Sequence, residues 1–140
     1  MAYDLQRFKA AQERDYSTAL AEIRAGRKRS HWIWYVFPQL QGLGHSNMCA
    51  LYGIRGMGEA EAYLYDETLR SRLVEISQAL LELEGHDPVA VMGGIDALKL
   101  RSCMTLFSRA SNTDPTFQAV LDKYYHGKPD KRTLKLLGIS

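Results

Sequence analysis

Hydrophobic side chains recur along this chain with the 3.6-residue period of an amphipathic α-helix, and capping or helix-breaking residues separate the periodic stretches. Asp4 precedes the first stretch and Asp130 precedes the last stretch as candidate N-caps, and Gly26 follows the first stretch. Asp87 and Asp114 each precede a proline, a pairing typical of an N-cap and the first helical residue. The pattern predicts a single turn at 88–91 and helices over 5–25, 47–52, 59–65, 69–83, 96–110, 115–125 and 131–137.

The segment from His31 to Ser46 has the highest density of large, rigid side chains. It reads HWIWYVFPQLQGLGHS and contains both tryptophans of the chain. Its first seven residues are apolar on both alternating faces, so periodicity does not separate a buried strand from a short helix capped by Ser30. A short helical or irregular segment is favoured because no second convincing strand is available to pair with it, and Pro38 ends it.

These elements predict an all-α fold, a compact bundle of about six or seven helices, some short, packed around the aromatic-rich segment. The 140 residues contain no long linker and no repeat, so residues 1–140 are expected to form a single helical domain. A hydrophobic content of 46% and a charged content of 24% are typical of a globular protein.

The net charge, the N-terminal residues and the cysteines indicate which partners and which cellular compartment to expect. Eighteen basic and sixteen acidic residues give a net charge of +2, which predicts no general attraction to nucleic acid or membranes. The N-terminus is charged and amphipathic rather than a secretory signal, and no apolar run approaches the roughly 20 residues that span a bilayer. Cys49 and Cys103 lack a CxxC or metal-ligand spacing and are expected to be free thiols. We therefore expect a cytoplasmic protein.

The aromatic segment also contains the residue types of a small-molecule site. Trp32 and Trp34 can stack on a planar base or a sugar face, although a place in the core of a small helical domain is the simpler interpretation. Gly42 and Gly44 allow the backbone to approach a ligand closely, and Ser46 is a candidate N-cap whose helix start can accept an anion. This glycine loop matches no Walker or dinucleotide fingerprint, so no cofactor is predicted.

Two histidines of this segment, His31 and His45, are candidate catalytic acid/base groups because an imidazole titrates near neutral pH. A structural role for either is the simpler interpretation. Their spacing fits no zinc motif, so no metal site is predicted.

Four polar residues complete the candidate ligand-binding set. Gln12 lies within the apolar seam of the first helix and must find partners or face a cavity. Gln39 lies beside the glycine loop. Lys99 pairs with Asp96 at i and i+3 or reaches an anion, with Ser102 supplying a hydroxyl.

Two functions remain open. The first is a small-molecule-binding domain that acts on a small anionic, nucleotide- or sugar-derived ligand, in which Trp32 and Trp34 stack the ligand. The second is a non-catalytic protein-interaction or scaffold module. The sequence does not decide whether the protein is an enzyme, nor its oligomeric state.

Three blocks, HWIWYVFPQLQGLGHS, DALKLRSCMTLF and GKPDKRTLKLL, carry a resemblance that extends over essentially the whole chain. The sequence resembles a family of small bacterial and plant proteins of unknown function that are often labelled calpastatin. The resemblance implies a single, mainly α-helical domain and assigns no catalytic residue. A calpastatin-type inhibitor is a disordered chain that folds on its target, whereas capped amphipathic helices and 10% aromatic residues predict a chain that folds alone.

Overall fold

The computed structural model describes residues 3–139, and the regular secondary structure of this range is entirely helical. The helices are α1 (Gln6–Arg24), α2 (Ile33–Val36), α3 (Asn47–Tyr52), α4 (Met57–Tyr65), α5 (Glu67–Glu82), α6 (Pro88–Met92), α7 (Gly94–Ser108), α8 (Pro115–Tyr125) and α9 (Lys131–Leu137). The predicted all-α bundle is confirmed, with α2 and α6 as separate short helices in addition to seven longer ones over this range. None of the described helices is both long and apolar enough to cross a bilayer.

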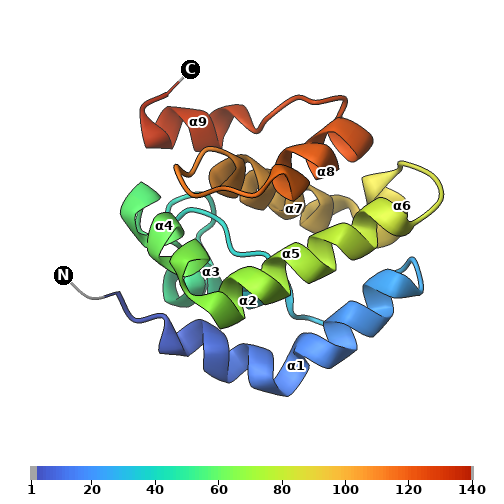
Figure 1. Cartoon of the computed structure of the whole chain (residues 1–140), viewed down its shortest axis with the longest axis horizontal. Coiled ribbons are helices and arrows are strands. Elements are labelled where there is room, and N and C mark those ends of the chain that lie inside the picture. The colour runs from blue at the N-terminus through green and yellow to red at the C-terminus, as the bar shows by residue number, and fades with distance from the viewer. Residues whose placement is uncertain (1–2, 140) are drawn as a thin grey trace.

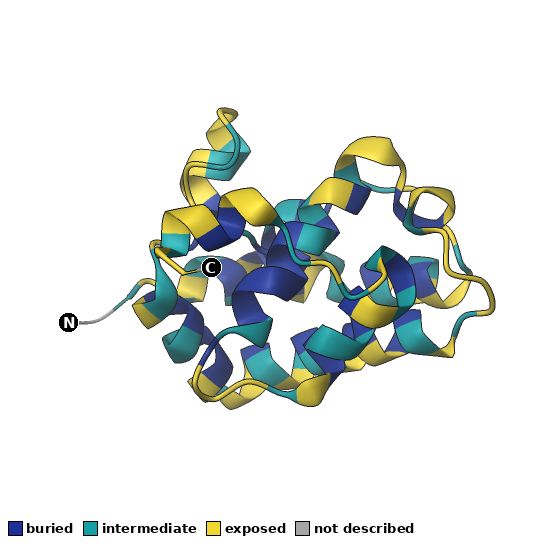
Figure 2. Cartoon of the chain, turned by 90° about the horizontal axis from the view of Figure 1, so that it is seen from above, coloured by how far each residue is buried: buried dark blue, intermediate teal, exposed yellow. Residues whose placement is uncertain are grey.

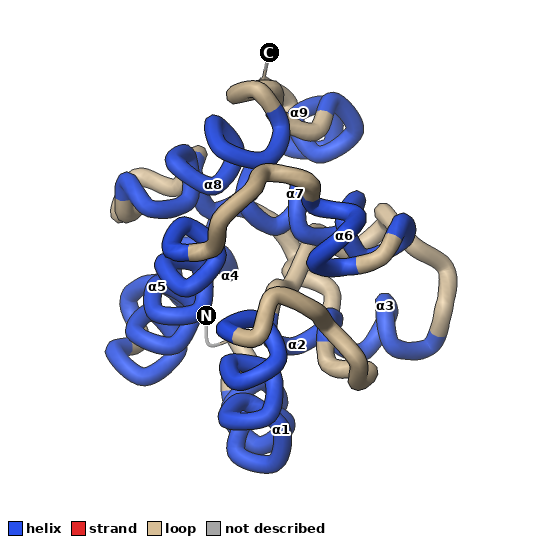
Figure 3. Tube along the Cα trace, turned by 90° about the vertical axis from the view of Figure 1, so that its right-hand side faces the viewer, coloured by secondary structure: helices blue, strands red, loops and turns tan. Residues whose placement is uncertain are grey.

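Helix α7 lies at the centre of the bundle, in contact with α2, α4, α6, α8 and α9 (Figure 1). Helix α5 packs against α1 on one side and α8 on the other, and the view along the bundle in Figure 3 shows these helices in adjacent positions. Buried positions gather on the inward faces of the helices, whereas exposed positions follow the outer faces and loops (Figure 2). The central position predicted for the 96–110 helix follows from its apolar surface, which faces several neighbours at once.

A row of aromatic rings connects four helices through the core. Phe8 of α1 meets Tyr63 of α4 edge-on at 5.2 Å, and Tyr63 lies 5.1 Å from Phe107 of α7. Phe107 lies 6.0 Å from Phe117 of α8. All four side chains are fully buried. These separations fall in the favourable range for aromatic pairs, so the row fixes the positions of the helices that carry the candidate site.

A buried ion pair attaches α3 and α4 to the start of α1. The Arg7 guanidinium donates to both Glu59 carboxylate oxygens, at 2.9 and 3.3 Å, and to the carbonyl oxygens of Leu51 and Gly53 at the end of α3. Glu59 is only 1% exposed and also accepts from the Arg55 amide at 2.8 Å. Arg7 thus satisfies carbonyls that the short α3 leaves without intrahelical donors.

The start of α1 differs from the prediction. Leu5, not Asp4, occupies the N-cap position, and no side-chain cap bond forms there. Asp4 instead offers its carbonyl oxygen to Arg7. The predicted capping aspartates at 87, 114 and 130, and Ser46 before α3, all accept a backbone N–H of their helix.

The loop that follows α2 is held against the end of α3. The Gln41 amide donates to the Ile54 carbonyl at 2.8 Å, and the Ile54 amide donates to the Gln39 carbonyl at 2.9 Å. A Cβ at Gly53 would lie 2.8 Å from the Gln41 Cα, so only glycine permits this approach. The loop therefore has a defined position beside α7, which places Gln39 and Gly44 at the candidate site.

Candidate functional site

Trp32 belongs to the core and anchors the chain between α1 and α2. Its side chain is 1% exposed and its ring lies 6.2 Å from Phe37. The indole Nε1 donates to Glu22 Oε1 at 2.9 Å. Because its polar atom has a partner and its ring is enclosed, Trp32 does not provide the exposed stacking surface that the sequence suggested.

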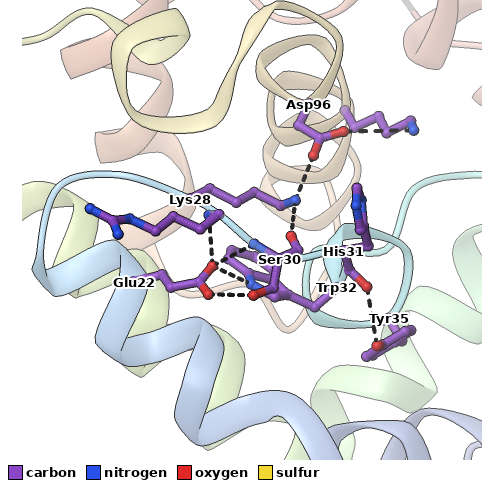
Figure 4. Close-up of polar contacts among 9 residues, drawn as sticks. Glu22, Lys28, Ser30, His31, Trp32, Tyr35 and Asp96 are labelled. Atoms are coloured by element: carbon purple, nitrogen blue, oxygen red, sulfur yellow. Dashed lines mark hydrogen bonds and ion pairs between the residues drawn. The ribbon is translucent and has the colours of Figure 1, made fainter.

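Glu22 is the acceptor around which the segment after α1 folds (Figure 4). Besides Trp32 it accepts the amides of Arg29 and Ser30, at 2.8 and 3.0 Å, and the Ser30 hydroxyl at 2.6 Å. Partial burial alone would raise the pKa of Glu22, but these hydrogen bonds outweigh it and lower the pKa to about 2. Ser30 is thus used to bind Glu22 rather than to cap α2.

The depressed pKa of Glu22 predicts acid sensitivity. Its contribution to the free energy of unfolding is present in full above its ordinary pKa of 4.5 and is lost as the pH falls toward 2. At pH 7, Glu22→Gln should destabilise the protein by about 1–3 kcal/mol. Denaturant unfolding at pH 7 and pH 3 checks this, and the gap between the two proteins should narrow at pH 3. The exposed Glu84→Gln serves as the control, and a gap that stays constant with pH would contradict the assignment.

Lys28, in the basic run 27–29, has a largely buried side chain. Its side chain is 6% exposed, and its ammonium pairs with Asp96 Oδ2 at 2.8 Å and lies 4.8 Å from the centre of the Trp32 ring. It also donates to the Ser30 carbonyl. The burial of this ammonium is compensated by these partners, and the pair joins the segment after α1 to the start of α7 (Figure 4).

Lys99 shares Asp96 with Lys28 but has the weaker contact. The Lys99 ammonium lies 3.7 Å from Asp96 Oδ1, beyond hydrogen-bond distance, and 5.1 Å from the centre of the Trp34 ring. Its side chain is 21% exposed. Within residues 3–139 we find no hydrogen bond from this ammonium. The predicted Asp96–Lys99 pair therefore exists as a long contact, and one carboxylate faces two lysines.

Two clefts meet at Lys99 and Ile95. The Arg132 cleft, of about 360 Å³, is lined by Gly44 and by the polar residues Gln39, Lys99, Ser102, Asp130 and Arg132. The Trp34 cleft, of about 440 Å³, contains His31, Trp34, Gly94, Asp96 and Lys99. A third hollow beneath Trp34 has only about 10 Å³ and is too small for a ligand.

Six predicted site residues are brought together by these clefts. Gln39, Gly44, Lys99 and Ser102 line the Arg132 cleft, while His31 and Trp34 line the Trp34 cleft with Lys99. The Ser102 hydroxyl donates to the Leu98 carbonyl at 3.1 Å, which leaves its oxygen lone pairs as acceptors. Trp34 is half-buried, and its Nε1 is a buried donor without an acceptor among the described residues.

The other five predicted residues lie elsewhere. Gln12 is buried in the core, where its amide nitrogen donates to the Tyr35 carbonyl at 2.7 Å and the Tyr63 hydroxyl at 3.0 Å. Trp32 is enclosed as described. Gly42, His45 and Ser46 are exposed on the loop before α3, outside both clefts. Ser46 caps α3 through the Cys49 amide at 3.1 Å.

Sequence reasoning missed Arg132 and Asp130 as site residues. Asp130 was expected only as a helix cap, which it is, since its Oδ2 accepts from the Thr133 amide at 2.9 Å. The Asp130 amide in turn donates to the buried Thr105 hydroxyl at 2.8 Å, which fixes the start of α9 against α7. Arg132 is exposed and makes no ion pair in the part of the chain that the structure describes. Neither residue has a local sequence signal that points to Lys99.

The described residues provide neither a cluster of metal ligands nor, at Cys103, an accessible reactive thiol. Residues 3–139 contain no group of three or more histidine, cysteine or acidic side chains arranged to hold a metal ion. Cys103 is buried, and burial raises the pKa of its thiol well above the ordinary value. The site therefore consists of cations, two carboxylates, hydroxyl and amide groups, one imidazole and one half-buried indole.

Comparison with known proteins agrees with the fold. The conserved hypothetical protein Rv1873 from Mycobacterium tuberculosis, which has a crystal structure, is 46% identical in sequence to this chain. The two structures match with a TM-score of 0.95 over 99% of each chain. No curated protein matches the chain significantly. The family model described as "Protein of unknown function (DUF1810)" matches residues 2–137. The chain belongs to this family.

Proposed function

We propose that this protein binds a small anionic molecule, derived from a sugar or a nucleotide, at the clefts that meet at Lys99. One observation carries the proposal: the Lys99 side chain is 21% exposed and lines both clefts, and its ammonium has no hydrogen-bond acceptor within residues 3–139. A partly shielded ammonium without an acceptor favours an anionic partner.

The local charge supports an anion over a neutral ligand. Asp96 is the carboxylate that Lys28 and Lys99 share, and its shorter contact is to Lys28. This group of three therefore carries one positive charge in excess. Arg132 adds a cation to the neighbouring cleft and Asp130 adds a carboxylate, so the excess over both clefts remains one positive charge. The guanidinium of Arg132 suits the geometry of phosphate or carboxylate.

The remaining side chains support a ligand that carries hydroxyl groups. Gln39 and Ser102 supply an amide and a hydroxyl oxygen, and Asp130 supplies a carboxylate, all in the Arg132 cleft. The volumes of the two clefts, about 360 and 440 Å³, lie within the range of roughly 300–1,000 Å³ typical of small-molecule sites. His31 stands in the Trp34 cleft as the candidate for proton transfer.

A thermal-shift screen over sugar phosphates and nucleotides tests the proposal. A ligand at 100 times its dissociation constant adds about 2.7 kcal/mol to stability. We expect a stabilising member of the panel whose affinity falls by about tenfold or more, about 1.4 kcal/mol, in Lys99→Met. Lys135→Met, which removes an exposed lysine from α9 outside the clefts, should bind normally. A folded protein with no shift across the panel, or one whose binding ignores Lys99, would refute the proposal.

A protein-interaction module is the second candidate, and two exposed apolar residues favour it. Ile95 is 73% and Leu98 is 64% exposed, and both lie on α7 at the edge of the Arg132 cleft. The same screen separates the candidates, because a docking surface made by these side chains has no need of the Lys99 charge.

A further inference from the structure

We infer that the ligand has two parts: a planar ring that lies in the Trp34 cleft, and a phosphorylated sugar that lies in the Arg132 cleft, with the phosphate at Lys99 and Arg132. The class that fits is a nucleoside phosphate. This inference rests on the proposed function and assigns an orientation within the same site.

The two clefts differ in chemistry. The Trp34 cleft provides a half-exposed indole, the small Gly94 and the apolar Ile95, and Lys99 is its only lysine or arginine. Indole rings bind nucleobases by stacking with little preference for one base. The Asp96 carboxylate on the same wall disfavours a phosphate there and can accept a hydrogen bond from a ring amino group. This cleft therefore favours an uncharged, planar part.

The Arg132 cleft provides two cations and several hydrogen-bonding groups. Lys99 and Arg132 outnumber the one carboxylate of this cleft, Asp130, and leave a net positive charge for a phosphate, whereas Asp96 balances Lys99 in the Trp34 cleft. The amide of Gln39, the hydroxyl of Ser102 and the carboxylate of Asp130 suit the hydroxyl groups of a sugar. The Thr105–Asp130 hydrogen bond of 2.8 Å holds the start of α9, and with it Arg132, in place beside α7. The phosphate position is thus built on fixed helices.

Lys99 fixes how the two parts connect. It lines both clefts, so a nucleoside phosphate can follow its covalent order across them: the ring lies in the Trp34 cleft, the sugar passes Lys99 at the junction into the Arg132 cleft, and the phosphate lies there between Lys99 and Arg132. A free sugar phosphate fills only one cleft, and a nucleoside lacks the charge that Lys99 needs.

Gly94 offers a way to block one cleft alone. A Cβ at Gly94 meets no heavy atom within 4 Å, and the residue begins α7 with no positive φ. Gly94→Leu should therefore fold normally and project a side chain into the Trp34 cleft. Ala50→Leu, at an exposed position of α3 outside both clefts, is the matched control. Arg132→Gln, with the adjacent exposed Lys131→Gln as its control, removes the second cation.

Calorimetric titration with AMP, ribose 5-phosphate and adenosine tests the inference. In the native protein AMP should bind at least tenfold more tightly than either of the other two. Gly94→Leu should reduce AMP affinity to that of ribose 5-phosphate and leave ribose 5-phosphate unchanged. Arg132→Gln should weaken AMP and ribose 5-phosphate by a similar factor and leave adenosine unchanged. Both control variants should match the native protein.

Other outcomes are distinguishable. Equal affinity for AMP and ribose 5-phosphate in the native protein, or an equal loss of both in Gly94→Leu, overturns the two-part ligand while Lys99-dependent binding preserves the proposed function. Binding that is insensitive to Lys99→Met overturns both.

Discussion

Replacing Trp32 by alanine should cost about 3–5 kcal/mol of unfolding free energy, the range for deleting a large aromatic side chain from a core. The ring is 1% exposed, packs against Phe37, and lies beneath the Lys28 ammonium. Its loss also leaves Glu22 without one of its hydrogen bonds. Denaturant unfolding monitored by circular dichroism measures the change.

Trp34→Ala is the matched comparison for Trp32→Ala. Trp34 is half-buried and its indole nitrogen makes no hydrogen bond within residues 3–139, so its loss should cost only about 1–2 kcal/mol. If Trp34→Ala proved the more destabilising of the two, the assignment of Trp32 to the core and Trp34 to the site would be wrong.

Glu59→Ala should destabilise the protein by about 3–5 kcal/mol, because it leaves the Arg7 guanidinium enclosed without its carboxylate. Arg7 retains its carbonyl acceptors at Leu51 and Gly53, but these are neutral and do not balance its charge. The Arg55 amide also loses its acceptor. Chemical unfolding at neutral pH gives the magnitude.

A double-mutant cycle identifies the source of that cost. The variant with both Arg7→Met and Glu59→Met should lose much less stability than the sum of its two single variants, because no unpaired charge then remains buried. Exposed Glu67→Ala, at the start of α5, should change stability little. Additive losses in the cycle would show that the two side chains act independently.

The long helices and the caps of α6, α8 and α9 were predictable from the sequence, because period and capping chemistry are local, whereas the cap predicted for α1 at Asp4 was wrong. The stripe on α5 and the aspartates before α6, α8 and α9 appear as predicted. The choice between the two indoles was not predictable. Trp32 is the N-cap of α2 and Trp34 lies within it. This helix has only four residues, so it is too short for periodicity to show which ring faces the core.

Only the part of the candidate site that has a local sequence signal was predicted. Lys99 and Ser102 stand out because they are polar residues on an apolar helix. Arg132 and the burial of Lys28 depend on contacts between segments far apart in the chain, which local pattern does not report. Gln12 was correctly marked as a polar residue in an apolar seam, but its partners proved to be the Tyr35 carbonyl and the Tyr63 hydroxyl of the core.

The two indole N–H signals of the chain allow the most direct test of the central claim, that the face built around Trp34 and Lys99 is the ligand-binding surface while Trp32 is core. In a proton–nitrogen correlation spectrum, with the signals assigned by Trp34→Phe, titration with AMP should shift the Trp34 indole signal saturably. The Trp32 indole N–H donates to Glu22 in the core, so its signal should not shift. Both indole signals remaining unchanged at saturating AMP, in a folded protein, would contradict the account.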